Sequence, residues 1–163
     1  MIIARNVAVG SVINVEVNYV LNANKQIKYK NIMVIGFNEQ FPDKIIAETK
    51  KHTIRVDQHD RWHAGMKMHM ATGVRTKKYK CFKLDTCKAT QRIEIKWCHL
   101  YKDAPRAVVN VDDKCIGSYT NMYPSGLLRI LAYNDGFDSV DAFFRWFNKD
   151  FTGKLIHWTD LRY

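Results

Sequence analysis

The chain has 163 residues, of which 47% are hydrophobic, and this length and composition suit one globular domain with a sizeable core. Its formal net charge is +10, and the region from Lys44 to Lys96 holds 14 Lys or Arg against 5 Asp or Glu. No apolar run approaches the roughly 20 residues of a membrane span and no leader pattern is seen, so we expect a cytoplasmic protein. The concentrated positive charge favours a polyanionic partner such as nucleic acid, while a solvated basic surface without a specific partner remains the alternative.

Residues 1–30 alternate apolar and polar side chains around an Asn-Ala-Asn turn signal at 22–24. Such alternation predicts either a hairpin that adds to a sheet or an N-terminal extension. We therefore divide the chain into this segment and one domain over residues 31–163.

The first part of the domain shows a strand, a short helix and two further strands. An apolar run over 32–37 predicts a strand, and Pro42 suits the first turn of a helix, where its missing N–H costs nothing. The β-branched run 52–56 predicts the next strand, on which we expect His52 to face solvent or to pack on a tryptophan. Gly65 indicates a turn, and the alternating methionines at 66, 68 and 70 predict a strand with one face in the core.

A basic loop follows, in which positive charges alternate with aromatic side chains. Its candidate ligand-binding residues are Arg75, Lys77, Lys78, Tyr79 and Lys80. Lysines bind phosphates and aromatic rings stack on unpaired bases, so the loop suits single-stranded nucleic acid. A hairpin tip kept in solution by its charge explains the pattern equally well.

The second part of the domain combines strands with one clear helix. Strands are predicted over 92–101 and 106–111, joined by a turn at 102–105 and closed by the polar residues 112–114. Asp138 is the expected cap of a helix whose apolar residues recur at helical spacing from Val140 to Phe151, and a last strand is predicted over 154–158. The pattern predicts an α+β fold, a small and mostly antiparallel β-barrel with two or three short helices.

The cysteines form no closely spaced pair of the kind that binds zinc, and they stand at Cys81, Cys87, Cys98 and Cys115. We interpret them as reduced thiols that pack as small hydrophobic side chains. The sequence predicts no metal site and no cofactor.

Three separated motifs resemble one known family. Residues 45–55 (IIAETKKHTIR), the Trp-His-Ala-Gly run at 62–65 and the segment 132–138 (AYNDGFD) are similar, in that order, to signatures of the ASCH family, a branch of the PUA-like β-barrels. The resemblance spans Ile32 to Trp158, and the tail Leu-Ile-His-Trp looks like the subgroup found in phages and prophages.

The resemblance implies a pocket at the barrel mouth for nucleic acid, above all RNA, or for a modified nucleoside, with DNA open as a second partner. By motif position the binding residues are Lys51, Arg55 and Trp62, together with the basic loop. A structural ion pair between Arg55 and Asp135 is the alternative role of that arginine. The oligomeric state stays undetermined.

Some members of the family hydrolyse the acetyl amide of N4-acetylcytidine with a lysine, a threonine and an acid, and others are proposed to be ribonucleases. The matching residues here are Lys50, Thr53 and Asp135. A threonine hydroxyl needs a base to take its proton, and a lysine can act as that base once burial or a neighbouring cation lowers its pKa.

Two departures from the family pattern make binding the first hypothesis, ahead of an amidohydrolase and of a non-catalytic interaction protein. Asp135 is one methylene shorter than the family's glutamate. Glu48 stands where the family has glycine, which costs on the order of 1 kcal/mol if that position is left-handed.

Overall fold

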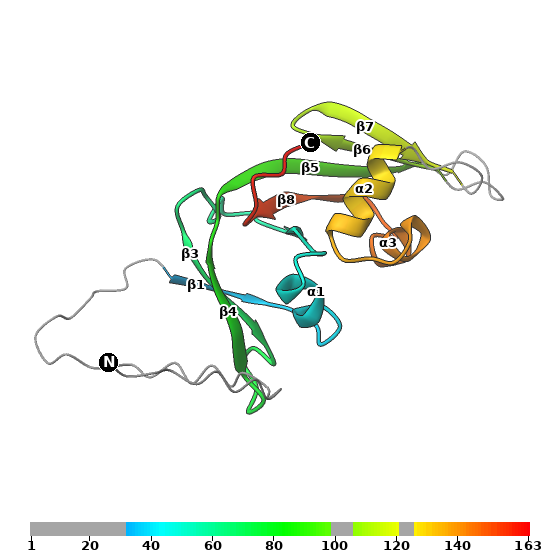
Figure 1. Ribbon diagram of the computed structural model, residues 1–163. Coiled ribbons are helices and arrows are strands. Elements are labelled where there is room, and N and C mark those ends of the chain that lie inside the picture. Colours follow the sequence, from blue (N-terminus) through cyan, green and yellow to red (C-terminus); the bar gives the residue numbers. More distant parts are fainter. Residues whose placement is uncertain (1–31, 99–105, 121–125) are drawn as a thin grey trace, which may run out of the picture.

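The computed structural model describes residues 32–98, 106–120 and 126–163. The segment 1–30 and the turn at 102–105 lie outside the described residues. Within them the chain forms three helices and eight strands (Figure 1). In chain order these are β1 (Ile32–Gly36), α1 (Pro42–Ile46), β2 (His52–Arg55), β3 (Lys67–Thr72), β4 (Lys80–Thr86), β5 (Ala89–Cys98), β6 (Arg106–Val111), β7 (Lys114–Tyr119), α2 (Gly126–Asn134), α3 (Val140–Trp146) and β8 (Phe151–His157).

The strands make two sheets, one in the order β1-β3-β4 and one in the order β2-β8-β5-β6-β7. Only the β1–β3 ladder is parallel among the described pairs, and the others are antiparallel. The prediction of an α+β fold with mostly antiparallel strands and short helices is confirmed. Closure into a PUA-like barrel stays a prediction.

Alternation of side chains along the strands places the core between the sheets and the helices. Met68 and Met70 on β3 are fully buried, as are Ile93 and Ile95 on β5. Successive strand side chains point to opposite faces, so residues two apart share the buried side. The prediction that the methionine strand turns one face to the core is confirmed.

The cap and the length of the aromatic helix were predicted incorrectly. Ser139, not Asp138, is the N-cap of α3, because its extended backbone lets the side chain accept the N–H of Ala142 at 3.0 Å. The helix ends at Trp146, and Phe151 begins β8 instead.

Three elements had no counterpart in the sequence prediction, namely β4, β7 and α2, and β4 begins at Lys80, inside the stretch expected to be a basic loop. The expected turn at 112–114 is present, with left-handed φ values at Asp112 (47°) and Asp113 (66°). Two consecutive left-handed residues match the right-handed twist of the flanking strands. The turn therefore folds β7 back onto β6 as a hairpin.

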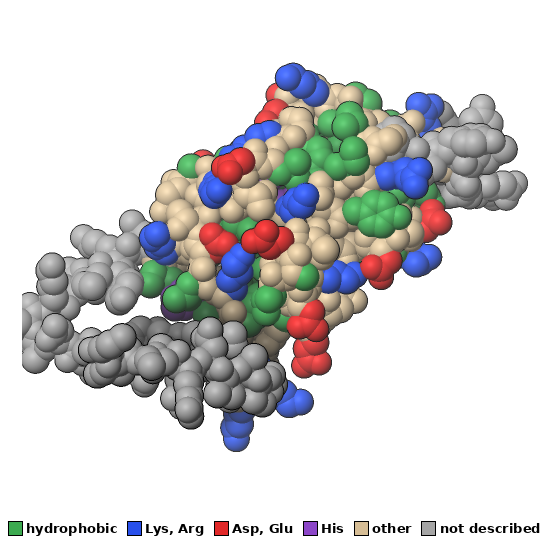
Figure 2. Space-filling view, viewed as in Figure 1, with side chains coloured by type: hydrophobic (Ala, Val, Ile, Leu, Met, Phe, Trp, Pro, Cys, Tyr) green, Lys and Arg blue, Asp and Glu red, His purple; other side chains and the backbone are tan. Residues whose placement is uncertain are grey.

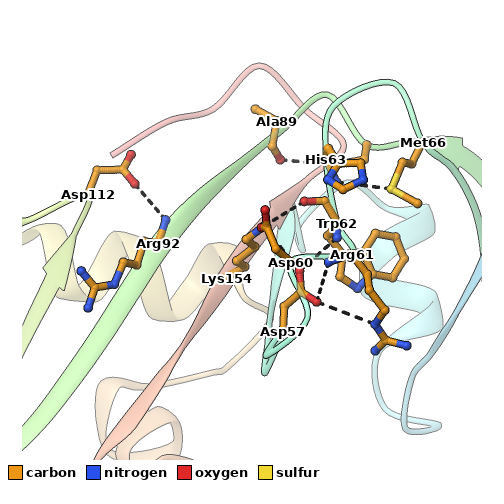
Figure 3. A network of polar contacts seen from close by, with 11 residues as sticks. Asp57, Asp60, Arg61, Trp62, His63, Met66, Ala89, Arg92, Asp112 and Lys154 are labelled. Atoms are coloured by element: carbon orange, nitrogen blue, oxygen red, sulfur yellow. Dashed lines mark hydrogen bonds and ion pairs between the residues drawn. The ribbon is translucent and has the colours of Figure 1, made fainter.

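The loop between β2 and β3 is held by one buried carboxylate (Figure 3). Asp57 accepts the backbone N–H groups of Arg61 and Trp62, each at 3.0 Å, and lies 3.4 Å from Lys154 Nζ. Burial alone raises the pKa of Asp57, but these donors outweigh it and lower the pKa below its usual value. The hydrogen bond from its backbone N–H to Asp57 helps to hold Trp62, which lies in the core and is only 4% exposed, although the motif resemblance implied a ligand-binding role for it.

The surface mixes charges of both signs. In the view of Figure 2, lysine and arginine side chains are interspersed with aspartate and glutamate. In the described part of the chain, no helix is long and apolar enough to cross a membrane.

Candidate functional site

The loop after α1 turns Lys50 into the protein interior. Glu48 has a left-handed backbone with φ of 58°, which is the conformation considered for it from sequence. The backbone N–H groups of Thr49 and Lys50 both donate to the carbonyl of Lys44, at 3.0 and 2.9 Å. This tight reversal leaves the Lys50 side chain only 1% exposed.

The end of α2 presents Asp135 to the same region. Gly136 N–H donates to the carbonyl of Tyr133 at 2.9 Å, and Phe137 N–H donates to that of Ala132 at 3.0 Å. These two bonds form a Schellman motif with a left-handed glycine, at φ of 87°. Asp135 is thereby fixed as the helix C-cap, with 4% exposure.

Gly136 also makes room for the lysine. A Cβ atom at this position would lie 2.9 Å from Lys50 Cδ and 3.2 Å from a ring carbon of Phe41. A side chain at position 136 would therefore collide with Lys50, in addition to the strain of its left-handed backbone. The Asp-Gly pair in the 132–138 motif accordingly has a packing role as well as a turn role.

Lys50 and Asp135 form a buried ion pair. Lys50 Nζ lies 2.8 Å from Asp135 Oδ1, donates to the Asp135 backbone carbonyl as well, and lies 4.6 Å from the centre of the Phe41 ring. Burial lowers the pKa of Lys50 despite the opposing effect of the carboxylate. Burial by itself raises the pKa of Asp135, but the charges and hydrogen bonds of Lys50 and His52 outweigh it and lower the pKa.

His52 extends this pair into a network. Its Nδ1 lies 3.5 Å from Asp135 Oδ1, and its Nε2 lies 2.8 Å from the hydroxyl of Tyr163, which also accepts a hydrogen bond from Asn134 at 3.1 Å. His52 is fully buried, and burial lowers its pKa. The prediction that it faces solvent or packs on Trp62 is wrong, because the β2–β8 pairing brings its ring against residues near the chain end.

A second buried histidine lies beside the network. His157 is fully buried, its ring centre lies 5.3 Å from that of His52, and neither ring nitrogen has a hydrogen-bond partner in the described part of the chain. Burial, followed by the charges of His52 and Arg162, lowers the pKa of His157 to about 3. The ring is therefore kept neutral in the folded protein at ordinary pH.

The other two motif residues on β2 have separate surroundings. Thr53 is 4% exposed and pairs with Ile156 across the sheet, and no hydrogen bond between the described residues joins its hydroxyl to Lys50 or Asp135. Arg55 donates to the carbonyl of Gly36 and lies 5.3 Å from the ring of Phe37. The structure therefore gives Asp135 a lysine partner in place of the arginine considered from sequence.

The basic loop forms the exposed turn between β3 and β4, at the lower end of the molecule in Figure 1. The side chains that the sequence singled out there are all exposed, namely Arg75, Lys77, Lys78, Tyr79 and Lys80. Thr76 holds the turn, since its hydroxyl donates to the carbonyl of Gly73 at 2.7 Å and accepts the N–H of Lys78 at 3.1 Å. Among the described hydrogen bonds and ion pairs, none joins this loop to the Lys50–Asp135 pair.

A surface cleft of about 520 Å³ lies between the loop after α1 and the end of α2. It is lined by Lys44, Glu48, Thr49, Lys51, Tyr133, Asn134, Gly136, Phe137 and Asp138. The Lys51 N–H donates to the Asn134 carbonyl at 2.7 Å, which joins the two walls. Lys51 is exposed and Tyr133 is 49% exposed, so both side chains are open to a ligand.

Sequence reasoning did not select Tyr133 or Asn134, although both stand directly before the Asp-Gly pair in the 132–138 motif. Their position next to the Asp-Gly pair was the signal in the sequence that could have marked them as site residues. The fold and the site together define an α+β protein with a polar cleft, lined by charged and aromatic side chains, next to the segments that hold a buried ion pair. Comparison with known protein families, with curated proteins and with solved structures gives no match to this chain.

Proposed function

We propose that this protein binds nucleic acid, RNA in the first place, or a modified nucleotide, in the cleft between the loop after α1 and the end of α2. The single observation that carries the proposal is that an exposed lysine, Lys51, and a half-exposed tyrosine, Tyr133, line the same cleft. Its volume of about 520 Å³ falls within the roughly 300–1,000 Å³ of ordinary ligand pockets.

The chemistry of the cleft suits a nucleotide. In the described part of the chain Lys51 has no acidic partner, so its ammonium is available to a phosphate, and the half-exposed ring of Tyr133 offers a stacking surface to a base. Lys44 is already paired with Asp138 at 2.6 Å. The Lys50–Asp135 pair joins the loop after α1 to the end of α2, the two segments that line the cleft, and the basic loop at 75–80 is a second contact for the backbone of a longer strand.

The ASCH resemblance belongs to this proposal. Its first motif supplies Lys51 and its third supplies Tyr133 and Asn134, and the 2.7 Å hydrogen bond between Lys51 and Asn134 brings the two motifs to one cleft. Contact between segments this far apart in sequence is expected if they jointly form a binding site.

Binding of a labelled single-stranded RNA by the full chain tests the proposal. We expect the affinity to fall steeply between about 50 and 200 mM salt, because phosphate contacts release counterions. Lys51→Ser should weaken binding and reduce the salt slope by about 0.7, whereas Tyr133→Ala should weaken binding roughly tenfold with the slope unchanged. Fluorescence anisotropy measures both quantities.

Lys149→Ser is the matched control, since Lys149 is also an exposed lysine but lines no part of the cleft. Equal effects of the Lys51 and Lys149 changes, or an affinity insensitive to salt, would contradict the proposal. The double change Lys77→Glu and Lys80→Glu separately tests the basic loop, where we expect a loss for long strands only.

An amidohydrolase acting on an acylated cytidine is the second candidate, favoured by one observation. Burial lowers the pKa of Lys50, which is what a lysine needs to accept the proton of a threonine hydroxyl. Catalysis then requires that the hydroxyl of Thr53 and Lys50 Nζ come into contact when the substrate binds.

Incubation with N4-acetylcytidine checks this candidate. If it holds, the wild type releases acetate and cytidine, and Thr53→Ala releases neither at a comparable rate, because the attacking hydroxyl is gone. Chromatography of the nucleosides measures the products. Lack of turnover by the wild type, or equal turnover by both proteins, excludes the mechanism and leaves the binding proposal intact.

A further inference from the structure

A second pocket, of about 310 Å³, adjoins the cleft. It is lined by Gln40, Lys44, Gly136, Phe137, Asp138, Ala142, Arg145 and Trp146. Four of these residues also line the first cleft, so the two hollows share the wall that contains the Lys44–Asp138 ion pair. The function proposed above does not use this second pocket.

Trp146 in the second pocket has an exposed aromatic ring that packs against two other aromatic rings. Its ring centre lies 6.4 Å from that of Phe41 and 6.0 Å from that of Phe137, with interplanar angles of 79° and 60°. Nevertheless 51% of the residue remains exposed, whereas Trp62 and Trp158 are 4% and 5% exposed. Edge contacts on two sides fix the ring and leave a large apolar surface open to a ligand.

A cation stands next to this ring. Arg145 precedes Trp146 on α3, its side chain is exposed, and it forms no ion pair with an acidic side chain in the described part of the chain. A guanidinium presents a planar set of donors that matches a phosphate. The second pocket thus repeats the combination of the first, an exposed aromatic ring and a cation without an acidic partner.

We propose that the second pocket is a subsite for a neighbouring nucleotide, and that the ligand is a single strand of at least two nucleotides. One base stacks on Tyr133 and the next on Trp146, and the phosphate that links them faces Lys44, which lines both pockets. A duplex keeps its base faces stacked inside, so it cannot use either ring. This inference rests on the function proposed above.

The ion pair in the shared wall must open when a phosphate binds to Lys44. Asp138 pairs with Lys44 at 2.6 Å and its side chain is 90% exposed, so an incoming phosphate competes with this carboxylate for the ammonium. Asp138→Asn should therefore strengthen the binding of a single strand several-fold.

The test compares cytidine monophosphate with a single-stranded RNA hexamer on the full chain. We expect Trp146→Ala to weaken the hexamer roughly tenfold and to leave the monophosphate unchanged, whereas Tyr133→Ala weakens both. Trp146→Leu is the second variant, because it keeps an apolar side chain against Phe41 and Phe137 while removing the stacking surface. Thermal unfolding of each variant establishes that it is folded.

Fluorescence gives an independent readout. Trp146 should provide most of the tryptophan emission that acrylamide quenches, and the hexamer should protect it from the quencher while the monophosphate does not. An RNA duplex should leave the quenching unaltered. A single-stranded DNA hexamer with the same dependence on Trp146 would support the subsite equally.

Two outcomes separate this inference from the function on which it rests. If the wild type binds neither ligand, the proposed function fails. If both ligands bind and neither Trp146 variant changes the hexamer affinity or its protection from acrylamide, the proposed function stands and the second subsite is overturned.

Discussion

Asp135→Ala is expected to lower the free energy of unfolding by about 3–5 kcal/mol, because it leaves the ammonium of Lys50 buried without its carboxylate. The side chains of Lys50 and Asp135 are 1% and 5% exposed, and their charged atoms lie 2.8 Å apart. Urea unfolding followed by circular dichroism measures the change.

The chain supplies a matched control for this prediction. Lys44 and Asp138 are also a lysine–aspartate pair, at 2.6 Å, but their side chains are 32% and 90% exposed. Asp138→Ala should therefore cost less than about 1 kcal/mol, since solvent screens such pairs. Similar losses in the two variants would mean that the buried pair has no special role in stability.

A double variant separates the charge from the packing. Lys50→Met combined with Asp135→Leu removes both charges and keeps apolar volume, and we expect it to recover much of the stability lost by Asp135→Ala. If the double variant recovered no stability, the loss caused by Asp135→Ala would be due to altered packing and not to the unpaired charge. RNA binding by a stable double variant would indicate that the cleft does not need the two charges.

Acid should destabilise the protein between about pH 6.5 and 3, and His157 is the main reason. Its pKa in the folded protein is about 3, against an ordinary value of 6.5. Within this window the unfolded chain binds a proton that the folded one does not, so stability falls as the pH falls. The slope for one such group approaches roughly 1.4 kcal/mol per pH unit.

The groups acting on His157 determine how far one substitution changes this slope. His52 and Arg162 oppose its protonation, and Asp112 favours it. His52 has a pKa lowered by burial in its own right, so it adds to the slope with the same sign. His157→Leu should therefore flatten the profile without abolishing it.

Unfolding in urea at a series of pH values measures the effect. His59→Leu is the control, since His59 is a histidine of the same chain with an exposed side chain. His157→Leu should also not destabilise at neutral pH, because it replaces ring nitrogens that have no described partner. An unaltered slope in His157→Leu would contradict the assignment.

Local patterns in the sequence predicted much of the sheet. The bounds of β6 agree with the predicted strand 106–111, and the alternating methionines predicted the buried face of β3, because a two-residue period is a property of the strand itself. Helix α2 was missed because its apolar side is broad and extends beyond the buried residues. Leu128 and Leu131 are buried while Leu127 and Ile130 are exposed, so the segment shows no clear apolar face.

The candidate site was predicted in part. Lys50 and Asp135 were paired from the motif resemblance, and they do lie in contact. His52 and Tyr163 are 111 positions apart, and the pairing of β2 with β8 brings them together, which no local pattern reports. Trp146 was not selected, because the helical period picks out the apolar residues on the core face of α3 and does not report which other side chains neighbouring elements leave uncovered.

The sheet order has a consequence for when the protein becomes functional during its synthesis. Strand β2, which follows Lys50 and Lys51, has a single neighbour in its sheet, β8 at residues 151–157. A ribosome that has completed only the preceding residues has therefore made both walls of the cleft but not the strand that anchors one of them. We infer that the cleft is completed late in synthesis, when β8 has left the exit tunnel.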